Sequence, residues 1–186
     1  MLRKTLVLLV LIAIVAVAAI MYLEFNQTKD VNENKIQQGE EEKIEYSTYT
    51  DYDYQFSVKH PKNWQVLTTD PELSVEFIEA QDRAAIGIYV VHSENTTLYD
   101  VKLEAESSRG NSALISERYI KVSGIDAYEQ TYDKTRNQKK LTEKQVFIVH
   151  NNYTYALSFA SFSSYFREYE VVFDNVVNSF EFTENK

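Results

Sequence analysis

The fold is decided by residues 144–182, which read KQVFIVHNNYTYALSFASFSSYFREYEVVFDNVVNSFEF. The first seven residues predict a strand, and the paired asparagines that follow predict a tight turn. In residues 153–160 large apolar side chains alternate with small or polar ones, which is the period of a strand. Apolar residues then recur at helical spacing: Phe166, Tyr169, Val172, Phe173, Val176, Val177 and Phe180. This segment therefore predicts two strands of a sheet and the helix that covers them.

The preceding residues predict more strands joined as hairpins. Alternation over 51–58 predicts a half-buried strand with Tyr52 and Tyr54 facing the core. Further strands are predicted at residues 75–79, 84–91, 115–122 and 127–134, with a short last strand at 180–182. A helix is predicted over about 98–108, capped by Thr96 or Thr97. Because hairpin neighbours pair antiparallel, the expected fold is α+β, with helices covering a central, mainly antiparallel sheet.

The N-terminus contains an uncharged apolar run. Residues 5–23 carry no charged side chain, and as a helix they would extend about 28 Å at about 1.5 Å per residue. That length matches the ~30 Å hydrocarbon core of a bilayer. Arg3 and Lys4 precede the run and Glu24 follows it, which predicts a cytoplasmic N-terminus and an outside C-terminal domain. Residues 1–23 are therefore interpreted as a single-pass anchor in the cell membrane.

A cleaved signal peptide is the alternative, and it would make the domain a secreted one. Ala16, Val17 and Ala18 have the small-x-small form of a cleavage site, but the apolar run exceeds the usual core of about 7–15 residues. Residues 24–49 are polar and acidic and predict a disordered linker. Residues 50–186 have the size of one ordinary domain.

Composition excludes several functional classes. The chain has 19 basic and 28 acidic residues, a net charge of −9, which disfavours nucleic acid as a partner. It has no cysteine, so disulfides, thiolate metal sites and cysteine nucleophiles are excluded. Only four glycines are present and none forms a phosphate-binding loop. No cofactor is expected.

Candidate chemistry is sparse. His60, His92 and His150 are the candidate metal ligands, and they would have to converge from three strand ends to form a site. No serine lies in a Gly-flanked nucleophile elbow, so no catalytic residue is assigned and the chain is not expected to be an enzyme. Candidate glycosylation sites, by the Asn-x-Ser/Thr pattern, are Asn26, Asn95 and Asn152. Candidate aromatic contacts to a peptide or glycan are Tyr46, Tyr49, Tyr52 and Tyr54.

Several motifs together resemble the PsbP-like family. Residues 54–64, YQFSVKHPKNW, resemble its opening strand and proline–tryptophan corner, and residues 123–128, SGIDAY, resemble its central glycine hairpin. Residues 155–159, with Tyr169, Phe173 and residues 176–180, resemble its closing strand and helix. The resemblance covers about residues 52–182 and implies an α/β/α sandwich of the PsbP and Mog type around an antiparallel sheet.

The resemblance also carries functional expectations. Plant members of the family are extrinsic subunits of photosystem II, a related eukaryotic protein binds a small GTPase, and many prokaryotic members are attached to membranes. The sequence therefore predicts a membrane-anchored, extracytoplasmic, non-catalytic module that binds a protein partner or supports assembly. A small-ligand or metal-ion binding module is the alternative. A photosystem II subunit and a hydrolase are further alternatives, and the N-terminal anchor in place of a plastid transit peptide weighs against the former.

Overall fold

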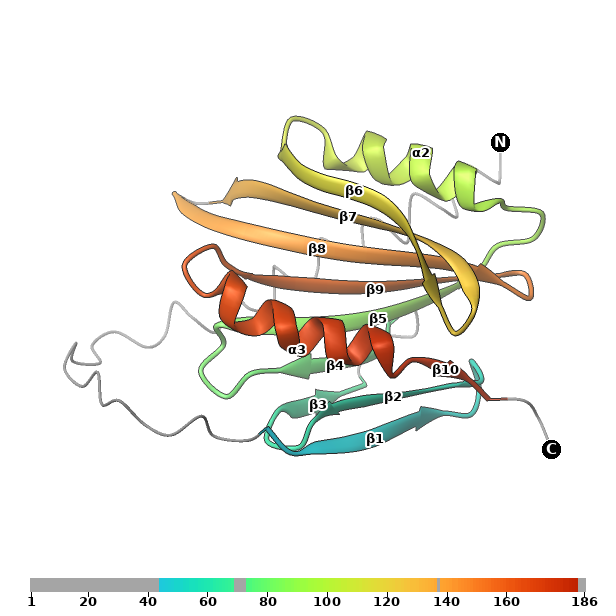
Figure 1. Ribbon diagram of the computed structural model, residues 1–186, viewed down its shortest axis with the longest axis horizontal. Coiled ribbons are helices and arrows are strands. Elements are labelled where there is room, and N and C mark those ends of the chain that lie inside the picture. The colour runs from blue at the N-terminus through green and yellow to red at the C-terminus, as the bar shows by residue number, and fades with distance from the viewer. Residues whose placement is uncertain (1–43, 69–72, 137, 184–186) are drawn as a thin grey trace.

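The computed structural model describes residues 44–68, 73–136 and 138–183 (Figure 1). The predicted anchor and residues 24–43 of the predicted linker lie outside this part of the chain. Within the described residues, no helix combines the length and apolar character needed to cross a membrane.

The described chain contains ten strands and two helices. In order they are β1 (Tyr46–Asp51), β2 (Phe56–Pro61), β3 (Gln65–Leu67), β4 (Leu73–Ile78), β5 (Ala84–His92), α2 (Leu98–Arg109), β6 (Ala113–Val122), β7 (Ile125–Arg136), β8 (Lys139–His150), β9 (Tyr153–Phe162), α3 (Phe166–Asn178) and β10 (Glu181–Phe182). The strands form a seven-stranded sheet, in the order β3-β4-β5-β9-β8-β7-β6, and a three-stranded sheet, in the order β1-β2-β10. Every pairing between these strands is antiparallel, which confirms the predicted α+β class with its mainly antiparallel sheet.

Two hairpins are positioned by the residues in their turns. Ser123 and Gly124 join β6 to β7 with φ values of 50° and 77°, and Asn151 and Asn152 join β8 to β9 with 49° and 63°. Two-residue turns with both φ angles positive match the twist of the strands that they connect, and Gly and Asn tolerate that conformation best. The sequence placed both turns correctly, although β8 begins at Lys139 and is longer than predicted.

Helix α3 covers one face of the seven-stranded sheet and forms the larger core. Its buried side chains are those of the predicted stripe: Phe166, Tyr169, Val172, Phe173, Val176 and Val177. Phe159 of β9 stacks on Phe173 with ring centroids 5.5 Å apart, and Trp64 meets Tyr169 edge-on at 5.8 Å. Burial of each apolar side chain of this size stabilises the fold by about 1.5–3 kcal/mol relative to leaving it exposed to water. In Figure 1, α3 lies in front of β9 and β5 and above the small sheet.

Helix α2 covers the opposite face, near β7 and β8. Its buried residues Val101 and Ala105 join a second cluster that contains Tyr128 of β7 and Phe147 of β8. Thr97 caps the helix, because its hydroxyl accepts from the Asp100 N–H at 3.2 Å while the Asp100 carboxylate accepts from the Thr97 N–H at 2.9 Å. The predicted helix is thus confirmed, and the two helices lie on opposite faces of the sheet.

The start of the domain differs from the prediction. Strand β1 begins at Tyr46, before the predicted domain start at residue 50, and the predicted strand over 51–58 is interrupted by a turn at 52–55. The Asp51 side chain accepts from the N–H groups of Asp53 at 3.1 Å and Tyr54 at 2.9 Å. An aspartate that bonds the backbone ahead of it favours a turn over a continuing strand. As a result Tyr52 points to solvent, with 83% of its surface exposed, and not into the core.

Replacement of Phe173 by alanine tests the seating of α3. Phe173 is 0% exposed, so Phe173→Ala should lower the free energy of unfolding by about 3–5 kcal/mol through lost contacts and a residual cavity. Val171 of the same helix is 63% exposed, so Val171→Ala is the matched control and should change it by about 0.5 kcal/mol or less. Equal effects of the two substitutions in urea denaturation would contradict this packing.

Candidate functional site

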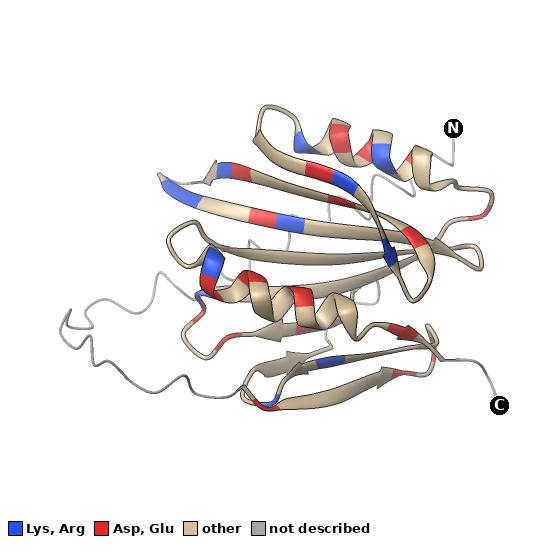
Figure 2. Cartoon of the chain, in the orientation of Figure 1, with Lys and Arg blue, Asp and Glu red and all other residues tan. Residues whose placement is uncertain are grey.

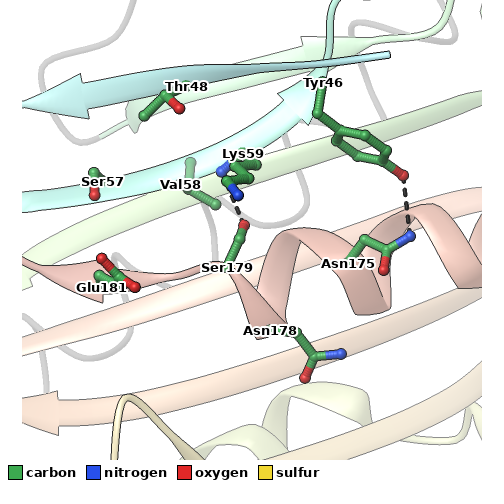
Figure 3. Close-up of a pocket in the computed structure, with 9 residues that line it drawn as sticks. All are labelled: Tyr46, Thr48, Ser57, Val58, Lys59, Asn175, Asn178, Ser179 and Glu181. Carbon is green, nitrogen blue, oxygen red and sulfur yellow. Dashed lines mark hydrogen bonds between the residues drawn. The ribbon is translucent and has the colours of Figure 1, made fainter. Parts of the chain in front are cut away.

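A groove of about 570 Å³ lies between the small sheet and the C-terminal end of α3 (Figure 3). We call it the β1–α3 groove. Its lining residues are Tyr46, Thr48, Ser57, Val58, Lys59, Asn175, Asn178, Ser179 and Glu181. The first five come from β1 and β2, and the last four come from α3 and the segment that follows it.

Ser179 fixes the end of α3 against β2. Its hydroxyl accepts from the backbone N–H of Lys59 at 2.8 Å and donates to the carbonyl of Val176 at 2.9 Å. Two residues further on, Glu181 pairs with Ser57 as the start of β10. The residues on both sides of the groove are therefore held by hydrogen bonds between segments that are far apart in the sequence.

A second contact spans the groove from β1. The hydroxyl of Tyr46 accepts from Nδ2 of Asn175 at 3.1 Å, as Figure 3 shows. Thr48 lies two residues further along the same strand, so it shares a sheet face with Tyr46. Strand alternation thus brings the tyrosine and threonine hydroxyl groups to the same side as the exposed amides of α3.

The groove is lined mainly by groups that form hydrogen bonds. Hydroxyl and amide groups dominate its lining, with one cation, Lys59, and one anion, Glu181. No histidine is among the lining residues, and the Ser179 hydroxyl is already bonded on both sides. The Ser179 hydroxyl therefore bonds to the backbone on both sides, and not to the side chain of a general base.

A smaller cavity, of about 130 Å³, lies beside the β8–β9 turn; we call it the aromatic cavity. Its lining residues are Asp53, Tyr54, Gln55, His150, Asn151, Tyr153, Tyr155, Phe182 and Thr183. The Tyr155 hydroxyl donates to the carbonyl of Tyr54 at 3.0 Å. Burial, with smaller effects from Tyr153 and Asp51, raises the pKa of Tyr155 to about 12, so the hydroxyl remains a donor at neutral pH.

The structure separates the three candidate histidines. His92 and His150 pair in register with Tyr153 from either side, and the His92 ring lies 5.2 Å from the Tyr153 ring. His60 instead stacks on Phe77 at 4.5 Å, and burial lowers the pKa of its imidazole. Throughout the described residues, no group of three or more His, Asp or Glu side chains is arranged to hold a metal ion.

The other candidate residues are dispersed. Asn95 and Asn152 are exposed turn residues with positive φ, whereas Asn26 lies outside the described chain. Of the four tyrosines proposed as aromatic contacts, Tyr46 lines the groove and Tyr54 the aromatic cavity. Tyr49 packs against the core, and Tyr52 is exposed.

Comparison with known proteins places this architecture in a family. The family model described as PsbP-like protein matches residues 5–182, which is most of the chain. The chain belongs to the PsbP-like family. The resemblance inferred from the sequence motifs is thereby confirmed. Among curated protein sequences, none matches this PsbP-like chain.

Solved structures show the same fold at low sequence identity. Cyanobacterial PsbP (CyanoP) from Synechocystis sp. PCC 6803 is 14% identical, with 84% of this chain and 99% of that chain covered and a TM-score of 0.56. LpqN of Mycobacterium tuberculosis, described as involved in cell envelope biogenesis, is 12% identical over 76% and 92% of the two chains, with a TM-score of 0.56. A point mutant of the protein Mog1 is 8% identical over 76% and 98%, also with a TM-score of 0.56. These three likenesses establish the fold of this PsbP-like domain.

Metal titration tests the histidine arrangement. Because His92 and His150 lie on either side of Tyr153 and His60 is buried elsewhere, Zn²⁺ or Mn²⁺ should not raise the melting temperature of the metal-free protein. The measurement is a thermal melt after chelator treatment, with and without added ion. A rise that disappears in a His92→Ala, His150→Ala double variant would contradict this expectation.

Proposed function

We propose that this PsbP-like chain is a membrane-anchored, extracytoplasmic, non-catalytic binding module whose β1–α3 groove receives a segment of a protein partner. The observation that carries the proposal is the groove itself. It is lined by hydroxyl and amide groups from two parts of the chain, and its lining contains no histidine to act as a base.

The chemistry of the groove suits a polypeptide. A peptide presents amide donors and carbonyl acceptors at regular intervals, and the groove supplies complementary groups on Tyr46, Thr48, Asn175 and Asn178. Lys59 and Glu181 provide one charge of each sign. Such charges determine the orientation of a bound segment more than they raise its affinity. Partner side chains of both signs can therefore be accommodated.

Strand β1 adds a second means of recognition. Within the described chain β1 pairs only with β2, so it is an edge of the small sheet. An exposed sheet edge can accept an extended peptide as an additional strand, with backbone hydrogen bonds giving affinity and neighbouring pockets giving specificity. A segment added at β1 would lie next to the Tyr46 side of the groove.

Charge supports a protein partner over nucleic acid. The net charge of −9 disfavours contact with phosphate backbones. Figure 2 shows acidic residues along both helices, with basic residues at other positions on the same helices and on the strands. The proposed partner is therefore a protein that offers a polar segment.

The extracytoplasmic location is inferred from the N-terminal sequence. Arg3 and Lys4 stand before the apolar run of residues 5–23, which orients such a segment with its N-terminus in the cytoplasm. The description of LpqN, a protein of the same fold, as involved in cell envelope biogenesis supports a role at the cell envelope.

Cysteine labelling tests the orientation in the membrane. The chain has no cysteine, so a single Tyr52→Cys substitution in the exposed 52–55 turn gives one accessible thiol. In intact cells this thiol should react with a membrane-impermeant maleimide, whereas a thiol introduced by Leu2→Cys, which keeps Arg3 and Lys4, should react only after permeabilisation. Labelling of Leu2→Cys in intact cells, or protection of Tyr52→Cys, would contradict the orientation.

Site-directed photo-crosslinking tests the groove. A photoreactive amino acid at Thr48 or at Asn178 should capture the same partner, because both residues line the groove. The control is the same amino acid at Ser107, an exposed residue of α2, which packs on the opposite face of the large sheet. A competing substitution that fills the groove, Ser57→Trp, should remove both crosslinks. Crosslinks of equal yield from Ser107, or their persistence in the Ser57→Trp background, would contradict a role for the groove.

A further inference from the structure

The aromatic cavity is lined by four aromatic side chains that contact one another. The Tyr54 and Tyr153 ring centroids are 6.1 Å apart at an interplanar angle of 73°, and those of Tyr153 and Tyr155 are 6.4 Å apart at 55°. Tyr155 in turn meets Phe182 at 5.1 Å and 76°. Four aromatic side chains from the 52–55 turn, β9 and β10 therefore line one small cavity.

The surroundings of the cavity are negative. Asp53 is one of the lining residues, His150 is another, and none of the rest is a lysine or an arginine. Asp51 lies directly behind the turn, where its carboxylate accepts from the N–H groups of Asp53 and Tyr54. Two carboxylates thus stand beside a set of aromatic rings whose faces also carry negative electrostatic potential.

The cavity is small, and aromatic rings make up a large part of its lining. Its volume of about 130 Å³ is below the ~300–1,000 Å³ of typical small-molecule sites, so the group that fits is a compact one. The carbonyl of Tyr54 is already bonded to the Tyr155 hydroxyl. A primary ammonium group is strongly hydrated and needs hydrogen-bond acceptors, whereas a methylated ammonium group needs only ring faces and nearby negative charge.

We propose that the aromatic cavity binds the quaternary ammonium group of a small organic cation. Tyr54, Tyr153 and Phe182 supply the ring faces, and Asp53 with Asp51 supplies the negative charge. The sequence segments that build it are the Asx turn after β1, the Asn-Asn hairpin and the strand after α3. This binding site is separate from the β1–α3 groove, and the proposal does not rest on a protein partner.

Titration of the full-length protein in maltoside micelles tests the proposal. Tetramethylammonium and choline should shift the backbone amide signals of Tyr54, Tyr153 and Thr183 in ¹H–¹⁵N spectra. The neutral carbon isostere of choline, 3,3-dimethylbutan-1-ol, should bind about tenfold more weakly, because it lacks the cation–π and carboxylate attraction. Equal binding of the isostere would show an apolar cavity without cation selectivity and would overturn the proposal.

Matched variants identify the groups responsible. Tyr153→Leu should weaken tetramethylammonium binding about tenfold, whereas Tyr153→Phe should retain it because the ring face remains. Asp53→Asn should weaken binding and reduce its dependence on salt. Tyr119→Leu changes an exposed ring on β6 and should have no effect. Thermal melts of each variant separate loss of binding from loss of fold. Unchanged binding in a folded Tyr153→Leu variant, or the absence of shifts at the three amides, would refute the site.

Two sources of the ammonium group are distinguished by a further comparison. Binding to vesicles of phosphatidylcholine but not to vesicles of phosphatidylglycerol would assign the cavity to a lipid headgroup. Binding of free choline without vesicle preference would assign it to a soluble cation. Crosslinking from Thr48 and Asn178 that is unaffected by choline would show that the groove functions independently.

Discussion

The position of α3 is the constraint on which both binding surfaces depend. Phe173 and Phe166 stack on Phe159 of β9 at 5.5 and 5.3 Å, and these contacts fix where the helix lies on the sheet. The position of the residues immediately after the helix follows from it. Ser179 reaches the Lys59 N–H in the groove, and Phe182 reaches the aromatic cavity. Apolar burial beneath one helix therefore organises polar and aromatic recognition at its C-terminal end.

A buried lysine sets the rotation of the same helix. Lys144 of β8 is nearly inaccessible, yet its ammonium donates to Asp174 at 2.7 Å and Glu170 at 3.2 Å, one turn apart on α3. Burial alone would lower the pKa of Lys144, but these acceptors and the charge of Glu129 raise it, so the side chain stays charged. Removal of either helix carboxylate would leave the buried ammonium of Lys144 with fewer partners. The protein would lose more stability from this change than from breaking an exposed ion pair.

The sequence predicted the parts of the fold that local patterns specify. The 3.6-residue period of α3, the alternation of β9 and the Asn-Asn and Ser-Gly turns each depend on neighbours within a few residues. The β1–α3 groove depends on the Lys59–Ser179 bond between residues 120 positions apart, which no local pattern encodes. Strand β1 was missed for a different reason. The alternating pattern of residues 51–58 runs through the turn that Asp51 forms, so the sequence did not show that one strand ends there and another begins. The polar residues Asn175 and Asn178, on an otherwise apolar helix end, were the one local sign of the groove.

Membership of the PsbP-like family fixes the architecture and leaves the surfaces to specify function. If seating of α3 governs both surfaces, the hydrogen bonds that tie its C-terminal extension to β2 must open together with the helix. Native-state hydrogen exchange measures this directly at the amides of Lys59, which bonds to Ser179, and Thr183, which bonds to Gln55. The expected result is that both amides exchange with the same opening free energy as the amides of Val176 and Val177 in α3. Exchange of Lys59 and Thr183 through a much lower opening free energy, while the helix stays protected, would contradict the account.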